Sequence, residues 1–248
     1  MLQKFLAVLG MALFTYTAVA QKDTRYFEMR IYYCHPGKLD ALVKRFTDHT
    51  TRIFEKHGME NIGYWLPVDN RENALYYVLA YPDKAARDAA WKAFGNDPER
   101  KKVEKASTKK GPIVAKVTSI FMDAPTISPV IQPSRTKADR SFDLRIYHCY
   151  PGQLNKLISR FQNHTMAFFS KHGMTNIAYW TTIEQENAQP KLVYLVAHNT
   201  PESGATSWEA FRNDPDWQEV KQSSEKEAPI VEKVETIALK PLPFSKIK

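Results

Sequence analysis

The sequence RIYYCHPGKL at residues 30–39 returns as RIYHCYPGQL at residues 145–154, and this pair of stretches decides the fold. The same offset of 115 residues carries on to NIGYW at 61–65 and NIAYW at 176–180. A second block, WKAFGNDP at 91–98, returns 117 residues later as WEAFRNDP. The period is too long for a solenoid repeat and corresponds to a duplicated domain of about a hundred residues. The chemistry of this chain must therefore be explained for two related sites.

Each copy predicts the element order β-α-β-β-α-β. Residues 26–33 alternate strictly between apolar side chains at odd positions and polar ones at even positions, which is typical of a strand with one buried face. Pro36-Gly37 then opens a helix with apolar residues at helical spacing as far as Lys56, and Gly58 ends it. The remaining predicted segments are strands at 61–68, 74–81 and 113–122 with a helix from 83 to about 107, and, in the second copy, strands at 142–149, 176–183, 191–198 and 230–239 with helices at 151–172 and 201–224. Two strand–helix–strand units back to back give a four-stranded antiparallel sheet with both helices on one face, which is a ferredoxin-like α+β domain.

The first twenty residues have the pattern of a secretory signal peptide. Lys4 gives a positive start, residues 5–16 form a short apolar run, and Ala18-Val19-Ala20 forms a small-x-small cleavage site. The run is too short to cross a bilayer, and an uncleaved membrane anchor is the alternative. We expect an exported protein, periplasmic or extracellular, with no membrane span in its mature chain. The boundaries we expect are 1–20 for the signal peptide, 21–123 for the first domain, 124–140 for a proline-containing linker and 141–248 for the second domain.

Composition and missing motifs narrow the classes of function. The formal charge of +8 is spread along the predicted helices and mixed with acids, so it indicates solvated surfaces and no nucleic-acid partner. Gly-rich nucleotide-binding loops, the G-x-S-x-G of serine hydrolases and the H-E-x-x-H of zinc enzymes are missing, and we expect no cofactor and no metal site. A haem ligand among the histidines stays open, since no feature selects one. Cys34 and Cys149 stand at equivalent places, which leaves open either a disulfide or two half-buried thiols.

The ordered series of motifs resembles the NIPSNAP family. The series consists of the strand FEMRIY at 27–32, PGKL at 36–39, His57-Gly58, the aromatic strand that ends in Trp65, a tyrosine-rich third strand, and the run Arg87, Trp91 and Asp97-Pro98. Both copies carry it, so the resemblance covers nearly all of the mature chain. In the second copy Asp143 replaces Glu28, and Ser203 or Gly204 stands near the place of Arg87.

The resemblance implies a dimeric α+β barrel, in which two ferredoxin-like sheets pack face to face with their helices outside. In this chain both sheets belong to one molecule, so the barrel is expected to be intramolecular. Relatives with this fold include antibiotic-biosynthesis monooxygenases, lactone isomerases and haem-handling enzymes. Because one fold carries several chemistries, the fold alone does not supply the reaction.

Polar residues that recur in both copies form the candidate site. On the first strand Arg30 and Tyr32 recur as Arg145 and Tyr147, each pair with a carboxylate two residues before the arginine. An arginine held by a carboxylate can orient an anionic ligand, with the tyrosine as a hydrogen-bond donor. The structural alternative is a buried ion pair that serves packing.

Histidines supply the candidate acid or base. His49 follows Arg45 by four residues and His164 follows Arg160 by four, so each pair shares one helix face. An imidazole titrates near neutral pH, and we expect His49 and His164 to be the catalytic residues of an enzymatic form of this protein. Arg45 and Arg160 are expected to bind substrate by orienting an anion.

Aromatic residues are abundant, and Trp65 and Trp180 are expected to line an apolar ligand pocket, with a place in the packed core as the alternative. The leading hypothesis is an exported tandem protein that binds a small, mostly apolar or anionic molecule between sheet and helices, either as a cofactor-independent oxygenase or isomerase or as a binder without catalysis. The rival hypothesis is a non-catalytic binding or assembly module of the cell envelope, with closed polar networks and no open cavity. The sequence leaves a homo-oligomer open.

Overall fold

The computed structural model describes residues 22–134, 140–183 and 188–248. The first half contains β1 (Tyr26–Cys34), α1 (Leu39–Arg45), η1 (Phe46–Thr50), α2 (Thr51–Lys56), β2 (Glu60–Pro67), β3 (Ala74–Tyr81), α3 (Lys84–Asn96), α4 (Pro98–Ser107) and β4 (Val114–Asp123). The second half contains β5 (Ser141–Cys149), α5 (Leu154–Arg160), η2 (Phe161–Thr165), α6 (Met166–Lys171), β6 (Thr175–Thr182), β7 (Leu192–His198), α7 (Pro201–Asn213), α8 (Pro215–Ser224) and β8 (Val231–Pro241). The order predicted for each copy, β-α-β-β-α-β, is confirmed.

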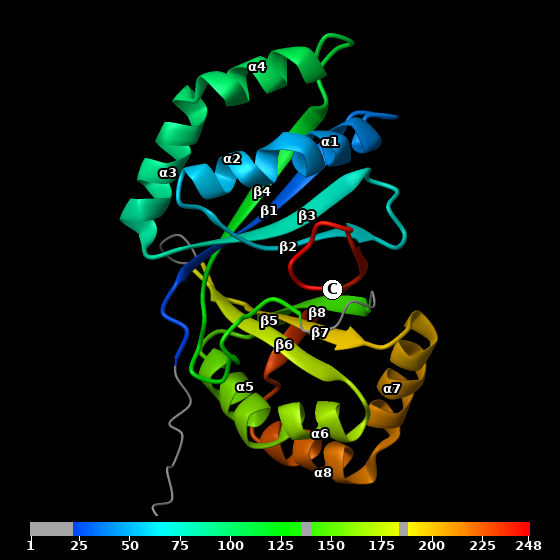
Figure 1. The fold of residues 1–248 in the computed structure, drawn as a ribbon. Coiled ribbons are helices and arrows are strands. Elements are labelled where there is room, and N and C mark those ends of the chain that lie inside the picture. Colours follow the sequence, from blue (N-terminus) through cyan, green and yellow to red (C-terminus); the bar gives the residue numbers. More distant parts are fainter. Residues whose placement is uncertain (1–21, 135–139, 184–187) are drawn as a thin grey trace, which may run out of the picture.

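All eight strands close into one barrel in the order β1-β3-β2-β8-β5-β7-β6-β4. Within each half the pairing is antiparallel, and the two half-sheets join through the pairs β2–β8 and β4–β6. The helices of the first half cover one outer side of the barrel and those of the second half cover the opposite side (Figure 1). The predicted intramolecular α+β barrel is therefore confirmed.

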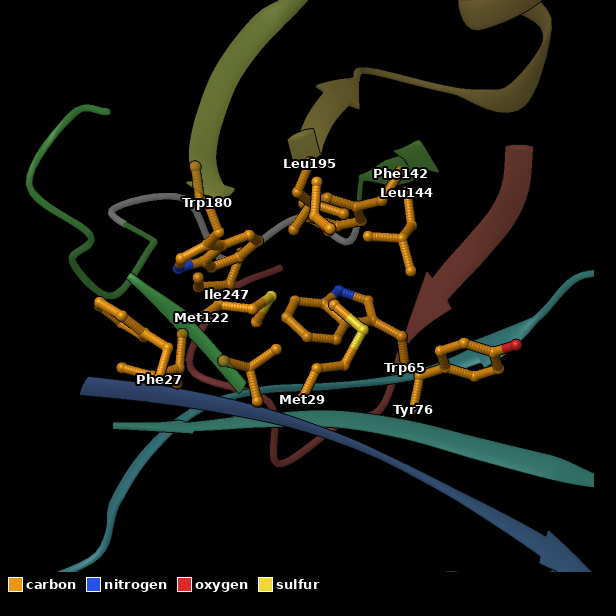
Figure 2. Close-up of a cluster of buried hydrophobic side chains, with 14 of the residues drawn as sticks. Phe27, Met29, Trp65, Tyr76, Met122, Phe142, Leu144, Trp180, Leu195 and Ile247 are labelled. Carbon is orange, nitrogen blue, oxygen red and sulfur yellow. The ribbon is translucent and has the colours of Figure 1, made fainter. Parts of the chain in front are cut away.

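The interior of the barrel is a packed apolar core. Alternate residues of each strand point inward, and side chains from both half-sheets meet there, among them Phe27, Met29, Trp65, Phe142 and Trp180 (Figure 2). The space that remains among them is about 10 Å³, at the lower limit of what a single water molecule needs. Over the residues that the structure describes, the barrel is thus a packed core without room for a ligand.

Gly63 shows how tightly that core is packed. A Cβ atom at this position would overlap the six-membered ring of Trp65, so only glycine lets the indole fold back over its own strand. At the equivalent position the second half has Ala178, which is fully buried below a differently placed Trp180.

The long first helix of each half contains one π-helical stretch. α1, η1 and α2 follow one another without a gap. Thr50 Oγ1 donates a hydrogen bond to the Arg45 carbonyl oxygen five residues earlier at 3.2 Å, and Thr165 does the same toward Arg160. Such stretches are rare and often occur at functional sites. The π stretch holds His49 and follows directly after Arg45.

A capped break separates α3 from α4. The Asp97 carboxylate accepts hydrogen bonds from the backbone N–H groups of Glu99 at 2.8 Å and Arg100 at 2.9 Å, and Pro98 occupies the first turn. The same carboxylate lies 2.8 Å from His57 Nε2, so this histidine ties the end of α2 to the start of α4. The break lets α3 and α4 follow the curvature of the sheet below them.

The described part of the segment expected to be a linker is bound to the barrel. Ser128 Oγ accepts a hydrogen bond from Tyr179 N at 3.0 Å, and Ile127 and Ile131 are buried. The C-terminal segment does the same on the other side, where Ser245 Oγ accepts from Tyr64 N at 2.9 Å. These two straps cover the aromatic strands β6 and β2. None of the helices in the described part of the chain has the length and hydropathy needed to span a lipid bilayer.

Candidate ligand pockets between sheet and helices

The polar face of β1 points outward, toward the helices, where Glu28 is the centre of a hydrogen-bond network. Glu28 is 0% exposed and accepts hydrogen bonds from Arg30 Nη1 at 2.7 Å, Arg87 Nη2 at 2.9 Å and Trp91 Nε1 at 2.8 Å. Burial raises the pKa of Glu28, but hydrogen bonds and charge from Arg87 and Arg30 outweigh it and hold the pKa below its usual value. In the first half the predicted pair of carboxylate and arginine is thus a closed, buried ion network.

The same place in the second half is built differently. Asp143 Oδ2 lies 2.9 Å from His198 Nε2 and accepts a hydrogen bond from Trp208 Nε1 at 2.5 Å. Burial acts to raise the pKa of Asp143, but these two bonds and the charges of His198 and Arg145 outweigh it and hold the pKa below its usual value. Gly204 stands at the position of Arg87, and a Cβ there would come within 3.0 Å of the His198 ring.

Arg145, the counterpart of Arg30, forms no salt bridge or hydrogen bond with a carboxylate among the described residues, and the nearby Asp143 acts on it through its charge alone. Its guanidinium lies over the Trp208 ring at 4.4 Å from the centroid and near the ring of Tyr147, and its Nε is buried without a hydrogen-bond partner. The Tyr147 hydroxyl in turn accepts a hydrogen bond from the Tyr194 hydroxyl at 3.2 Å. The second half therefore holds a guanidinium without the salt bridge that its counterpart forms in the first half.

A pocket between sheet and helices lies at the same place in both halves. We call these the inner pockets; the first has a volume of about 210 Å³ and the second about 380 Å³. Equivalent residues line the two: Tyr32 and Tyr147, Arg45 and Arg160, Phe94 and Phe211, Val114 and Val231, Val117 and Val234. Arg145 lines the second pocket, whereas Arg30 is absent from the lining of the first.

Each half also has an open groove on its outer side, between the π stretch and the helix that follows the aspartate break. These outer grooves have volumes of about 530 Å³ in the first half and about 750 Å³ in the second, and they contain His49 and His164. Neither histidine has a hydrogen-bond partner among the described residues, and neither lines an inner pocket. The structure therefore does not bring the predicted acid or base together with Arg30 or Arg145.

Arg45 and Arg160 lie on the boundary between inner pocket and outer groove, since each lines both. Arg160 Nη1 donates to Glu225 Oε1 at 2.8 Å, which neutralises it. Arg45 donates only to Ser107 Oγ at 3.3 Å, and burial lowers its pKa. In each half, therefore, one of the two predicted anion-orienting arginines is paired with a carboxylate.

The two tryptophans predicted to line the pocket lie on the other face of the sheet. Trp65 and Trp180 are buried inside the barrel, so the structure places them with the core and away from both inner pockets (Figure 2). The aromatic walls of the second inner pocket come instead from Trp208, Phe211 and Trp217.

Three residues of the two networks were not predicted as site residues: His198, Arg87 and Lys221. The equivalent positions carry different residues, namely Tyr81, Gly204 and Glu104. The sequence showed the difference between Arg87 and Gly204, but a search for recurring residues gives such differences no role in a site.

Thiols and metal-binding groups complete the inventory of reactive side chains. Cys34 and Cys149 are free and buried, and burial raises the pKa of both thiols to about 11. Of the two alternatives that the sequence left open, the structure has two separate thiols. In the described ranges no three His, Cys, Asp or Glu side chains gather in a way that could hold a metal ion.

The second inner pocket can bind and orient a small molecule. Its wall offers a guanidinium without a carboxylate, a tyrosine hydroxyl and flat aromatic faces, which is the mixture of apolar surface and few polar groups typical of small-molecule sites. The first inner pocket offers a smaller volume and one such cation, Arg45.

Comparisons with known proteins agree with this architecture. The family model described as NIPSNAP matches residues 27–129 and 142–246. Among solved structures, a candidate monooxygenase of Fusobacterium nucleatum subsp. nucleatum is similar, with a TM-score of 0.60, 12% identity, and coverage of 88% of this chain and 93% of that one. An anthrone oxidase-like protein has a TM-score of 0.58 and 10% identity, with 89% and 92% covered. A third, a candidate monooxygenase of Lactobacillus acidophilus, has a TM-score of 0.55 and 12% identity, with 88% and 93% covered. No curated protein sequence matches the chain.

Proposed function

The chain belongs to the NIPSNAP family and carries two copies of its domain, and from that premise we propose that it binds a small, mostly apolar or anionic molecule in its inner pockets. The observation that carries the proposal is the recurrence of a cavity at the same place in both halves, lined by equivalent residues. The second pocket, at about 380 Å³, also falls within the usual range of ligand sites, roughly 300–1,000 Å³.

The catalytic form of this proposal is a cofactor-independent oxygenase or isomerase. Its support is that the similar solved structures carry the names of oxidising enzymes, and that Arg145 and Tyr147 offer a cation and a hydroxyl to a developing oxyanion. His49 and His164 lie in the outer grooves, and Arg45 and Arg160 stand between them and the inner pockets. In the catalytic form, the two histidines would exchange protons with a ligand from that side. Unchanged ligand binding or turnover after the combined change His49→Ala and His164→Ala would remove both histidines from the proposal.

The assembly module remains the second candidate because of one observation in the first half. The network around Glu28 is closed, and the barrel core is filled. Both features serve stability and need no ligand. This candidate predicts a protein that purifies without any bound small molecule and in a defined complex with other proteins.

We also propose that the protein is exported. The predicted signal peptide, residues 1–20, lies outside the described residues, so its support is the pattern of charge, apolar run and small residues. N-terminal sequencing of protein from its native host is expected to begin at Gln21, and a chain that begins at Met1 in the cytoplasm would contradict export.

Native mass spectrometry of protein purified from its own host tests the binding function. We expect an added mass of a small molecule that disappears when Val231→Phe fills the second inner pocket or Val114→Phe fills the first. Val68→Phe is the matched control, because Val68 is 59% exposed and lines neither pocket. A second test measures the melting temperature of the unmodified protein and of Val231→Phe with a set of aromatic compounds. The proposal would be refuted if the purified chain carries no small molecule and if these compounds shift the melting temperatures of both proteins equally.

A further inference from the structure

We propose that the second inner pocket is an anion site, selective for a carboxylate on a flat aromatic body, and that the first inner pocket does not share this selectivity. The inference rests on the proposed function, since it names the ligand class of one of the two pockets. It assigns the decisive role to Arg145, which lies on β5 at the floor of that pocket.

The charge of the second inner pocket favours an anion. Five cationic and two acidic side chains line it. Of the acids, Glu225 is already paired with Arg160. Arg145 forms no salt bridge with a carboxylate in the described part of the chain, and Lys221 adds a further cation at the pocket wall. A buried or half-buried guanidinium that lacks a counter-ion costs free energy, and binding an anion there recovers it.

Four differences between the halves create this state. Asp143 is one methylene shorter than Glu28, and its carboxylate is held by His198 and Trp208, so it forms no ion pair with Arg145. Gly204 removes the second arginine that the first half has at position 87, and Lys221 replaces a glutamate at position 104. Lys221 thus puts a cation where the first pocket has an acid, and Arg145 keeps no salt bridge to Asp143.

The first inner pocket has a smaller positive excess, since two arginines and one glutamate line it. Its free arginine, Arg45, shares the pocket wall with Glu104, which also forms an ion pair with Arg100 at 2.9 Å. Arg30, the counterpart of Arg145, is bound to Glu28 and donates to Ser119 Oγ as well. An anion entering this smaller pocket would meet fewer cations than in the second pocket.

The aromatic part of the ligand follows from the walls of the second pocket. Trp208, Phe211 and Trp217 line it, and the guanidinium of Arg145 lies over the Trp208 ring. Stacking on an indole leaves the edge of a guanidinium free for a carboxylate, which accepts two parallel N–H bonds in the preferred geometry. A planar aromatic acid satisfies both the edge and the rings.

Isothermal titration calorimetry at pH 7 with 2-naphthoate and its neutral analogue 2-naphthamide tests this inference. We expect one site per chain for 2-naphthoate, bound about tenfold or more tighter than the amide, as a charge-assisted hydrogen bond supports. Arg145→Met is expected to abolish the preference for the acid. Lys221→Glu, a change at an exposed position that leaves the fold intact, is expected to reduce it.

Two control variants fix the location. Arg30→Met removes the equivalent arginine of the first half, which is already neutralised, and is expected to leave the preference for the acid unchanged. Arg45→Met removes the free arginine of the first pocket and is expected to do the same. Loss of 2-naphthoate binding in Arg45→Met with retention in Arg145→Met would overturn the placement.

The remaining outcomes separate this inference from the proposed function. Equal binding of acid and amide, both abolished by Val231→Phe, would overturn the anion site and keep the binding function. Absence of 2-naphthoate binding at millimolar concentration would also overturn the anion site, while native mass spectrometry on host-derived protein decides the binding function independently.

Discussion

Replacing the buried carboxylate of the first half should cost far more stability than replacing its counterpart in the second. In Glu28→Gln the side chain keeps its shape but loses its charge, so Arg30 loses its counter-ion and Arg87 keeps only its ion pair with Asp88. Those two groups are only 14% and 19% exposed, so water replaces the lost pairing poorly. Removing one partner of a buried pair costs about 3–5 kcal/mol, a large part of the roughly 5–15 kcal/mol that stabilises a typical protein.

Asp143→Asn is the matched change in the second half. Asp143 accepts from an indole and lies against an imidazole, with no ion pair to an arginine, so the loss is that of hydrogen bonds, about 1–2 kcal/mol. Urea denaturation at pH 7 measures both free energies of unfolding. For a chain of this size the melting temperature should fall by about 6–20 °C in Glu28→Gln and by a few degrees in Asp143→Asn. Equal losses, or a greater loss in Asp143→Asn, would refute the idea that only the first half depends on its ion network.

Three further predictions concern single residues. Hydrogen bonds from Lys56 and from backbone N–H groups at the start of α4 lower the pKa of Asp97. Its contribution to the free energy of unfolding is therefore complete above about pH 4 and is lost as the pH falls through the native pKa. Asp97→Asn should flatten the acid side of a curve of unfolding free energy against pH, measured with urea. Cys34 and Cys149, with thiol pKa values raised to about 11, should react with Ellman's reagent at pH 8 only after unfolding, and rapid labelling of the native protein would contradict their burial. Gly63→Ala should cost about 1–3 kcal/mol and shift the fluorescence of Trp65, because the new methyl group displaces the indole; an unchanged emission spectrum would count against the packing described.

The fold could be predicted from the sequence because the first strand alternates between apolar and polar residues, which shows its two faces. The alternation at residues 26–33 separates the barrel face from the helix face, and the repeat of the whole series implies two equal half-sheets. The closure of the barrel was not readable from the residues themselves. It depends on short pairings, Trp65–Pro67 with Leu239–Pro241 and Met122–Asp123 with Thr181–Thr182, that carry no distinctive sequence signal. Only the family resemblance pointed to it.

The candidate site was readable in part, for a related reason. Recurrence found Arg30 and Arg145, Tyr32 and Tyr147, because identical residues at one offset stand out. Recurrence also placed Trp65 in the predicted site, although this side chain points into the barrel. The sequence does not reveal which face of a strand points toward a cavity. Arg30 forms a salt bridge with Glu28, whereas the side chain of Asp143 is one methylene shorter and forms none with Arg145. The sequence does not reveal whether two side chains reach one another.

A duplicated domain inside one closed sheet can divide stability and binding between its copies. β1 and β5 belong to the same barrel, so the ion network around Glu28 stabilises a body that also contains Arg145, which has no salt bridge among the described residues. Because folding free energy is shared by the whole cooperative unit, a cost of a few kcal/mol in the second half is offset by a strong network in the first. A homodimer of identical domains has no such freedom, since each change occurs in both subunits. Fusing the two halves into one chain therefore permits the asymmetry between the two inner pockets, and it makes the second half the place to look for the ligand.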